Sequence, residues 1–279
     1  MNVQKVDYKS TNCPRDFSAS LRETGFSVLH NHPIDIALIE KVYSEWVKFF
    51  ESDFKHDYLF SEDGQDGYFP FKTENAKGAP QKDLKEFFHV YDWGKFPKEL
   101  SNATLDLQSQ LITLTSTLLN WIQVETPDEV TELFSVPLPK MIENSKTNLL
   151  RVIHYPPLDG SEEEGAIRGA AHEDINLITL LVAGTQPGLQ VRDIEGGWHD
   201  VSCDPGCIAV NTGDMLQMAS NGYYPSTTHQ IINPGDTIKN ESRYSMPLFL
   251  HPEDGVKLSS QYTARQYLEE RLKEIGLKN

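Results

Sequence analysis

The hydrophobic spacing of the chain changes near residue 147, and this change constrains the fold more than any other feature. From that point, short apolar runs are separated by clusters rich in Gly, Pro, Asn and Asp, which favour turns. Many short strands at such spacing are typical of a β-sandwich or jelly roll. The expected strands are 149–155, 177–182, 188–191, 207–211, 228–232 and 244–250.

Helical patterns flank this β-rich region. Apolar residues recur every three or four positions between 39 and 50 and again over 99–123, which predicts two amphipathic helices. Near the C-terminus, Thr263 and Gln266 form a capping box, a signature of a helix start. Gly276 stands where the cap at the end of that helix belongs.

The expected architecture is therefore mainly β with flanking helices. We predict a helical N-terminal region over 1–146, a double-stranded β-helix (jelly-roll) core over 147–252, and a C-terminal helix within 253–279. The three parts are expected to form one compact unit. Residues 61–97 hold many Gly, Pro and aromatic residues and are interpreted as an irregular connection that packs on the core.

Charge and composition limit the class of partner. The chain has 25 Lys and Arg against 41 Asp and Glu, a net charge of −16. Nucleic-acid and anionic-membrane binders need a basic face, so neither class of partner is expected. No apolar run approaches the roughly 18 residues of a membrane-spanning helix, and no signal-peptide core is seen. We expect a cytoplasmic protein that acts on a small molecule; the sequence does not indicate its oligomeric state.

A candidate metal site lies in the β-rich half. His172 and Asp174 are two residues apart, so in an extended chain their side chains point to one face. His229 lies in another expected strand, which pairing can bring alongside. Two imidazoles and one carboxylate form the facial triad of non-haem Fe(II) oxygenases, with open positions for a 2-oxo acid and O2. Alone, an H-x-D triplet is a weak motif that also arises by chance.

A second pair of residues suits a carboxylate ligand. Arg243 and Ser245 are again two apart and share one face of an expected strand. A guanidinium beside a hydroxyl can bind a carboxylate in a forked manner. The alternative is a surface arginine, but the neighbouring residues predict a buried strand, and a buried arginine needs a partner.

In combination these segments resemble a known family, the iron/ascorbate oxidoreductases, which are 2-oxoglutarate- and Fe(II)-dependent oxygenases related to isopenicillin N synthase. The stretch 172–181 is similar to the family's first-ligand strand, and 243–245 is similar to its R-x-S strand. Residues 187–191 and 198–201 resemble the hairpin between them. The resemblance covers most of the chain and is strongest over 147–252.

The resemblance implies an enzyme and its cofactors. His172, Asp174 and His229 would bind Fe(II), with 2-oxoglutarate and O2 as cosubstrates and ascorbate as a possible reductant. The reaction would be oxidation of an unidentified small molecule. Hydroxylation, desaturation and cyclisation are all compatible with the same site, so the sequence leaves the outcome open.

The resemblance also implies how the cosubstrate is held. Arg243 and Ser245 would pair with the distal carboxylate of 2-oxoglutarate, and Tyr155 would bond its inner carboxylate. The family usually has Asn two residues before that tyrosine, and this chain has Ile153. The details of cosubstrate binding are therefore open.

Substrate recognition is less visible in the sequence. Phe249 shares a face with Arg243 and Ser245, and is a candidate for the substrate pocket together with Arg168, Tyr68 and Phe88. Each candidate has a structural alternative. The aromatic residues suit a hydrophobic core, and Arg168 suits a solvated or ion-paired loop beside the acidic run 162–164.

Two other functions remain open on the sequence alone. One is an Fe(II) oxidase that uses O2 without 2-oxoglutarate, because some relatives that keep the R-x-S pair work in this way. The other is a non-catalytic jelly roll that binds a ligand. A complete ligand triad together with a complete R-x-S pair disfavours the second alternative, since a binding module needs neither.

Overall fold

A computed structural model describes residues 1–75, 80–235 and 239–274. The helices are α1 (Cys13–Thr24), α2 (Ile36–Glu51), the 3₁₀ helix η1 (Asp53–Tyr58), α3 (Ala103–Glu125), α4 (Asp128–Thr131), α5 (Leu138–Met141), α6 (Asp214–Ala219) and α7 (Ala264–Glu274). The strands are β1 (Lys5–Asp7), β2 (Phe26–His30), β3 (Gly67–Phe69), β4 (Glu86–Val90), β5 (Leu149–Tyr155), β6 (Gly169–His172), β7 (Ile178–Val182), β8 (Leu189–Arg192), β9 (Trp198–Asp200), β10 (Ile208–Thr212), β11 (His229–Ile231) and β12 (Arg243–Leu250).

Two sheets form the core of the molecule. The larger sheet has the strand order β1-β2-β10-β7-β12-β5-β4-β3, and the smaller has the order β6-β11-β8-β9. The β1–β2 pair is parallel and the other pairs are antiparallel. One cluster of buried side chains takes members from both sheets, so the sheets pack face to face. The predicted jelly-roll core with flanking helices is confirmed.

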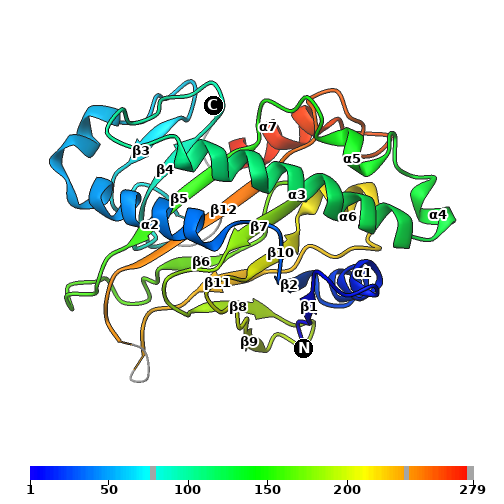
Figure 1. The fold of residues 1–279 in the computed structure, drawn as a ribbon, viewed down its shortest axis with the longest axis horizontal. Helices are drawn as coiled ribbons and strands as arrows, with labels where there is room; N and C mark the ends of the chain where they lie inside the picture. Colours follow the sequence, from blue (N-terminus) through cyan, green and yellow to red (C-terminus); the bar gives the residue numbers. More distant parts are fainter. Residues whose placement is uncertain (76–79, 236–238, 275–279) are drawn as a thin grey trace.

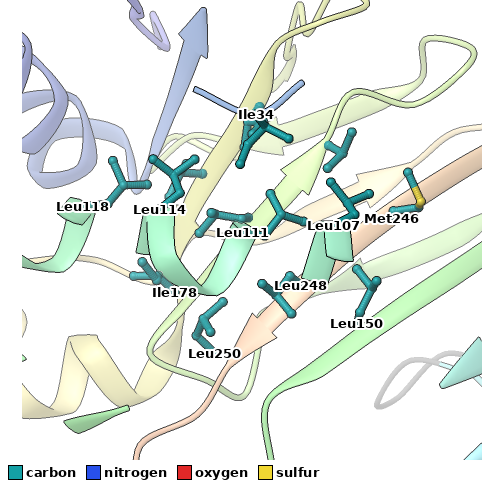
Figure 2. Packing of buried hydrophobic residues seen from close by; sticks show 14 of the residues in the cluster. Ile34, Leu107, Leu111, Leu114, Leu118, Leu150, Ile178, Met246, Leu248 and Leu250 are labelled. Carbon is teal, nitrogen blue, oxygen red and sulfur yellow. The ribbon is translucent and has the colours of Figure 1, made fainter. Parts of the chain in front are cut away.

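Helices cover the other face of the large sheet. Figure 1 shows α2 and α3 lying along one side of this sheet, with the small sheet on the opposite side. The leucine stripe of α3 packs against strand residues, and all of these side chains are buried. Figure 2 shows this contact, in which Leu111 and Leu114 lie near Ile178 and Leu248.

The two faces of β12 have different roles: one packs in the core and the other lines a cavity. Tyr244, Met246 and Leu248 belong to the core beneath the helices. Ser245 and Phe249, on the other face, line a cavity between the two sheets. Because the side-chain period of a strand is two, one strand can complete the helix-facing core and also supply the cavity wall.

The N-terminal region differs from the sequence expectation. It supplies β1 to β4 to the large sheet, and β3 and β4 fall inside the stretch that was expected to be irregular. All five residues of β4 are buried, because one face meets the helices and the other meets the space between the sheets. A strand buried on both faces shows no alternation of polar and apolar residues, so its sequence carries no strand signal.

The C-terminal helix begins as predicted. The backbone N–H of Thr263 donates to Oε1 of Gln266 (3.0 Å), and the N–H of Gln266 donates to Oγ1 of Thr263 (3.3 Å). These reciprocal bonds are the predicted capping box. Gly276, the expected end cap, lies outside the described residues. Within the described ranges, the helices are too short or too polar to cross a lipid bilayer.

Candidate active site

Strand pairing brings the three candidate metal ligands together. His172 ends β6 and His229 begins β11, and these two residues are direct partners in the antiparallel register. Asp174 follows β6 by two residues. The Nε2 atoms of His172 and His229 each lie 3.7 Å from Oδ1 of Asp174. One donor atom from each of the three residues lies within 4.8 Å of the other two.

Hydrogen bonds leave the right atom free on each ligand. Nδ1 of His172 donates to the carbonyl of Ala170 (2.8 Å), and Nδ1 of His229 donates to the carbonyl of Thr227 (3.1 Å). Each ring therefore carries its proton on Nδ1 and presents the lone pair of Nε2. Such partners fix the tautomer and the orientation of a metal-binding imidazole.

The carboxylate is oriented in the same way. Oδ2 of Asp174 accepts hydrogen bonds from Thr179 Oγ1 (2.5 Å) and Asn211 Nδ2 (2.8 Å). Oδ1 is left to face the two imidazoles. The sequence analysis gave Thr179 and Asn211 no role of their own, because neither is a ligand and their contacts depend on tertiary structure.

The protonation states also suit a cation. Burial and the neighbouring His229 lower the pKa of His172 to about 4. Burial alone would raise the pKa of Asp174, but His229, His172 and the two hydrogen bonds outweigh it and hold the pKa below its ordinary value. At neutral pH the cluster therefore offers a neutral imidazole from His172 and the carboxylate of Asp174, and the hydrogen bond of His229 Nδ1 leaves its Nε2 facing them. This donor set and its facial arrangement fit Fe(II).

Replacing Asn211 by alanine should weaken metal binding without breaking the fold. The substitution removes one of two hydrogen bonds that orient Asp174, and Thr179 remains. We expect Fe(II) affinity to fall by about 10–100-fold, the usual cost of losing such a partner. Calorimetric titration of Fe(II) under argon measures the change, and unaltered affinity would show that Asn211 does not orient the ligand.

A cavity opens beside the cluster. The empty space in and around it, including its opening to solvent, is about 580 Å³. Both sheets contribute to its wall. The lining residues are Phe26, Lys85, Arg151, Ile153, Tyr155, Gly169, His172, Asp174, Thr179, Leu181, Leu189, Asn211, His229, Ile231, Ser245, Pro247 and Phe249.

Arg243 is buried close to this cavity and retains an unused donor. Its Nε donates to the carbonyls of Gln186 (3.0 Å) and Pro187 (3.2 Å), and its guanidinium lies 5.1 Å from the ring centre of Tyr155. Among the described residues, its buried Nη1 has no hydrogen-bond partner. A Cβ at Gly184 would come within 2.9 Å of Nη2, so glycine at that position gives the side chain room.

The unpartnered guanidinium nitrogen of Arg243 suits a carboxylate of 2-oxoglutarate. Leaving a buried charged donor unsatisfied is costly, so this atom requires an acceptor. Ser245 and Tyr155 line the cavity wall nearby. A carboxylate bound there would satisfy the donor, so the three residues fit the acid end of the cosubstrate.

The four substrate-pocket candidates are placed differently from one another. Phe249 lines the cavity. Phe88 and Tyr68 lie in the core beneath the helices instead, because they belong to the face of their strands that points away from the cavity. Arg168 is a buried residue rather than a loop arginine paired with the acidic run 162–164. Its Nη2 donates to the carbonyl of Glu241 (2.7 Å), and it lies outside the cavity lining.

Two basic residues at the cavity wall were missed by the sequence analysis. Arg151 precedes Ile153 and Tyr155 by two and four residues in β5, so all three side chains point to the same face. The period of two could therefore have placed Arg151 on the cavity face. Lys85 immediately precedes β4, the strand that carried no sequence signal. Apart from the candidate metal ligands, they are the charged members of the lining.

Comparison with known proteins agrees with the fold and with a dependence on iron. The model of the 2OG-Fe(II) oxygenase superfamily matches residues 146–252, and the model of the N-terminal region of the non-haem dioxygenases in morphine synthesis matches residues 8–108. A crystal structure of a Shewanella oneidensis protein assigned as an oxygenase is 51% identical, covers 99% of each chain and has a TM-score of 0.90.

Two further relatives are linked to the cosubstrate 2-oxoglutarate, one by its name and one by its crystal structure. The 2-oxoglutarate-dependent dioxygenase citB of Monascus ruber is 29% identical over 84% of this chain and 77% of its own length. A full-length Neurospora crassa protein, solved in complex with α-ketoglutarate (2-oxoglutarate), is 21% identical, covers 96% of this chain and 95% of that chain, and has a TM-score of 0.81.

A jelly roll with a cluster of two histidines and one aspartate is typical of non-haem iron oxygenases. The chain belongs to the 2OG-Fe(II) oxygenase superfamily. It is a 2-oxoglutarate-dependent dioxygenase whose cofactor is Fe(II) and whose cosubstrates are 2-oxoglutarate and O2. The 2OG-Fe(II) oxygenase family, and Fe(II), 2-oxoglutarate and O2 as predicted from the sequence, are thereby confirmed.

Proposed function

We propose that His172, Asp174 and His229 hold the Fe(II), and that Arg243, Ser245 and Tyr155 hold 2-oxoglutarate, for the oxidation of a small organic molecule. The observation that carries this assignment is the pairing of two features beside one cavity. The free Nε2 and Oδ1 atoms of the triad converge at the cavity wall. Arg243, whose Nη1 has no partner among the described residues, precedes the lining residue Ser245 by two positions in the same strand.

Iron bound to the triad would supply the coupling of O2 activation to decarboxylation of the cosubstrate. The protein residues have simpler tasks. Arg243 and Ser245 would fix the distal carboxylate, and the phenol of Tyr155 would donate to the inner one. Leu181, Leu189 and other apolar lining residues would keep bulk water away from the reacting atoms.

The alternative of a 2-oxoglutarate-independent oxidase is weaker. Such an enzyme would have no use for a carboxylate at Nη1 of Arg243, a buried donor that no described protein group satisfies. A non-catalytic jelly roll would need neither this donor nor the oriented ligands. We therefore favour the cosubstrate-dependent oxygenase, in the branch of the family related to isopenicillin N synthase.

The test is anaerobic. Fe(II) and then 2-oxoglutarate are added to metal-free protein, and the visible absorbance is followed for the charge-transfer band of a chelated 2-oxo acid. We expect the band to appear only when both are present. Iron binding without the band would favour the oxidase, and absence of iron binding would contradict the proposed ligands.

The proposal extends to organisation and location. The ranges 1–146, 147–252 and 253–279 would act as one structural unit, since β4 of the first range pairs with β5 of the second. A reducing, cytoplasmic location would suit the three free cysteines Cys13, Cys203 and Cys207. The substrate would be a small molecule, in keeping with a cavity that is lined by both sheets.

A further inference from the structure

Two cations lie at the cavity wall of a strongly acidic protein. Lys85 and Arg151 both line the cavity, and their side chains are only 9% and 16% exposed. Burying a cation is costly unless it is paired, so each must have a reason to be there. The assigned iron and cosubstrate sites use neither residue.

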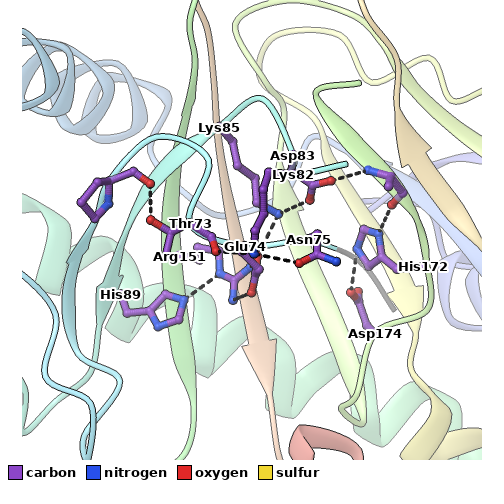
Figure 3. Close-up of polar contacts among 12 residues, drawn as sticks. Thr73, Glu74, Asn75, Lys82, Asp83, Lys85, His89, Arg151, His172 and Asp174 are labelled. Atoms are coloured by element: carbon purple, nitrogen blue, oxygen red, sulfur yellow. Dashed lines mark hydrogen bonds and ion pairs between the residues drawn. The ribbon is translucent and has the colours of Figure 1, made fainter. Parts of the chain in front are cut away.

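Two carboxylates balance these cations from outside the cavity lining. Nζ of Lys85 lies 2.7 Å from Oδ2 of Asp83 and 2.9 Å from Oε2 of Glu74. Nη1 of Arg151 lies 3.0 Å from the same Oε2 of Glu74, and Nη2 lies 3.4 Å from Oε1. Because neither Glu74 nor Asp83 is part of the lining, the cluster turns its positive side to the cavity. Figure 3 shows Glu74 between the two basic side chains.

The guanidinium of Arg151 is fixed from every side. Its Nε donates to Nε2 of His89 (2.8 Å), and Nδ1 of His89 donates to the carbonyl of Gln65 (2.6 Å). Burial and the adjacent Arg151 hold the pKa of His89 well below its ordinary value, so the ring is neutral. The guanidinium carbon lies 4.5 Å from the ring centre of Phe87 and 5.5 Å from that of Phe249. A cation immobilised in this way loses little entropy when it binds a ligand.

The cluster is also connected to a candidate metal ligand. Oδ1 of Asp83 accepts the backbone N–H of Ala170 (3.0 Å). The carbonyl of Ala170 in turn accepts Nδ1–H of His172 (2.8 Å). Figure 3 traces this chain of bonds from Lys85 to His172. A group bound at Lys85 would therefore lie in the same cavity as the iron and on the same bonded framework.

We propose that Lys85 and Arg151 form a subsite for a carboxylate on the substrate, so that the enzyme oxidises small organic acids. This inference rests on the proposed function of the site. Lys85 has three N–H donors; among the described residues Asp83 and Glu74 take two of them, which leaves the third for a ligand. A substrate carboxylate entering a largely apolar cavity needs charged donors, and these two residues supply them.

A purely structural ion cluster is the competing explanation, and the two explanations differ in the sign of one effect. Under the structural explanation, every substitution that breaks the cluster weakens the protein and its ligand binding alike. Under the proposed one, Glu74 competes with the substrate for the same two cations. Removing the charge of Glu74 should then strengthen the binding of an acid, and removing the charge of Lys85 or Arg151 should weaken it.

The experiment uses matched acid and amide probes. Benzoate, phenylacetate and cinnamate, each with its primary amide, are titrated calorimetrically into protein loaded with Fe(II) and 2-oxoglutarate under argon. We expect at least one acid to bind about tenfold or more tightly than its amide, the effect of one charge-assisted hydrogen bond. Lys85→Gln and Arg151→Gln should abolish this preference, and Glu74→Gln should increase acid affinity by a similar factor.

Lys82→Gln is the matched control. Lys82 is exposed, lies outside the cavity lining and carries the same charge three residues from Lys85. This variant should bind the probes as the unmodified protein does. Thermal melting of each variant checks that it is folded, and if Arg151→Gln unfolds, Lys85→Gln and Glu74→Gln carry the test.

The outcomes separate this inference from the proposed function. Equal binding of acids and amides, or the absence of acid binding even in Glu74→Gln, overturns the carboxylate subsite. A fall in acid affinity in Glu74→Gln supports the structural explanation and overturns the carboxylate subsite. The charge-transfer band reports the binding of iron and 2-oxoglutarate and does not depend on the carboxylate subsite. The band can therefore be absent while the acid preference persists, or present while the acid preference is absent.

Discussion

Replacing Asp174 by alanine is expected to lower the affinity of the protein for Fe(II) by at least about 100-fold, because loss of a mere orienting partner already costs about 10–100-fold. The substitution removes the anionic donor of the cluster and leaves only the two imidazoles. The charge-transfer band with 2-oxoglutarate should disappear with the iron. Calorimetric titration of Fe(II) and the visible spectrum measure the two effects.

Glu173→Ala provides the matched control for that variant. Glu173 adjoins Asp174 and carries the same charge, but it is exposed and accepts a hydrogen bond from Thr228 (3.0 Å) outside the cavity. It should retain full iron binding. Unchanged iron content and an intact band in Asp174→Ala would rule out the assignment of Asp174 as a ligand.

The metal cluster was predictable from sequence because it depends on local geometry and a single strand pairing. The spacing of His172 and Asp174 places both at one strand end, and a pairing partner had only to deliver His229. The same period of two placed Ser245 and Phe249 on one face of β12. The fold class followed from the strand spacing for a similar reason, since alternation and turns are local properties.

The rest of the site depends on contacts between distant segments. Asn211 reaches Asp174 only because β10 lies beside β7 in the large sheet. Lys85 reaches the cavity through β4, whose five residues are all buried and show no alternation. Phe88 and Tyr68 were predicted to line the pocket because they are aromatic, whereas the strand face that carries them points to the helices. No local pattern in the sequence distinguishes these faces.

Replacing Arg243 by methionine is expected to raise the concentration of 2-oxoglutarate needed for half-saturation by about 100-fold, in the range for loss of one partner of a buried charge pair. Methionine keeps much of the aliphatic length, so the loss is mainly that of the guanidinium. The affinity for Fe(II) should change little, because Arg243 contacts none of the three ligands in the hydrogen bonds and ion pairs among the described residues. Anaerobic titration of the charge-transfer band measures the half-saturation point directly.

Arg192→Met is the control for this substitution. Arg192 is an exposed residue of β8 outside the cavity lining, so the net charge of the protein changes equally while the cavity is untouched. Its half-saturation point should match that of the unmodified protein. If Arg243→Met also bound 2-oxoglutarate normally, the unpartnered Nη1 would not be the anchor of the cosubstrate. The acid would then have to be held elsewhere in the cavity, where Lys85 and Arg151 are the remaining charged donors of the lining.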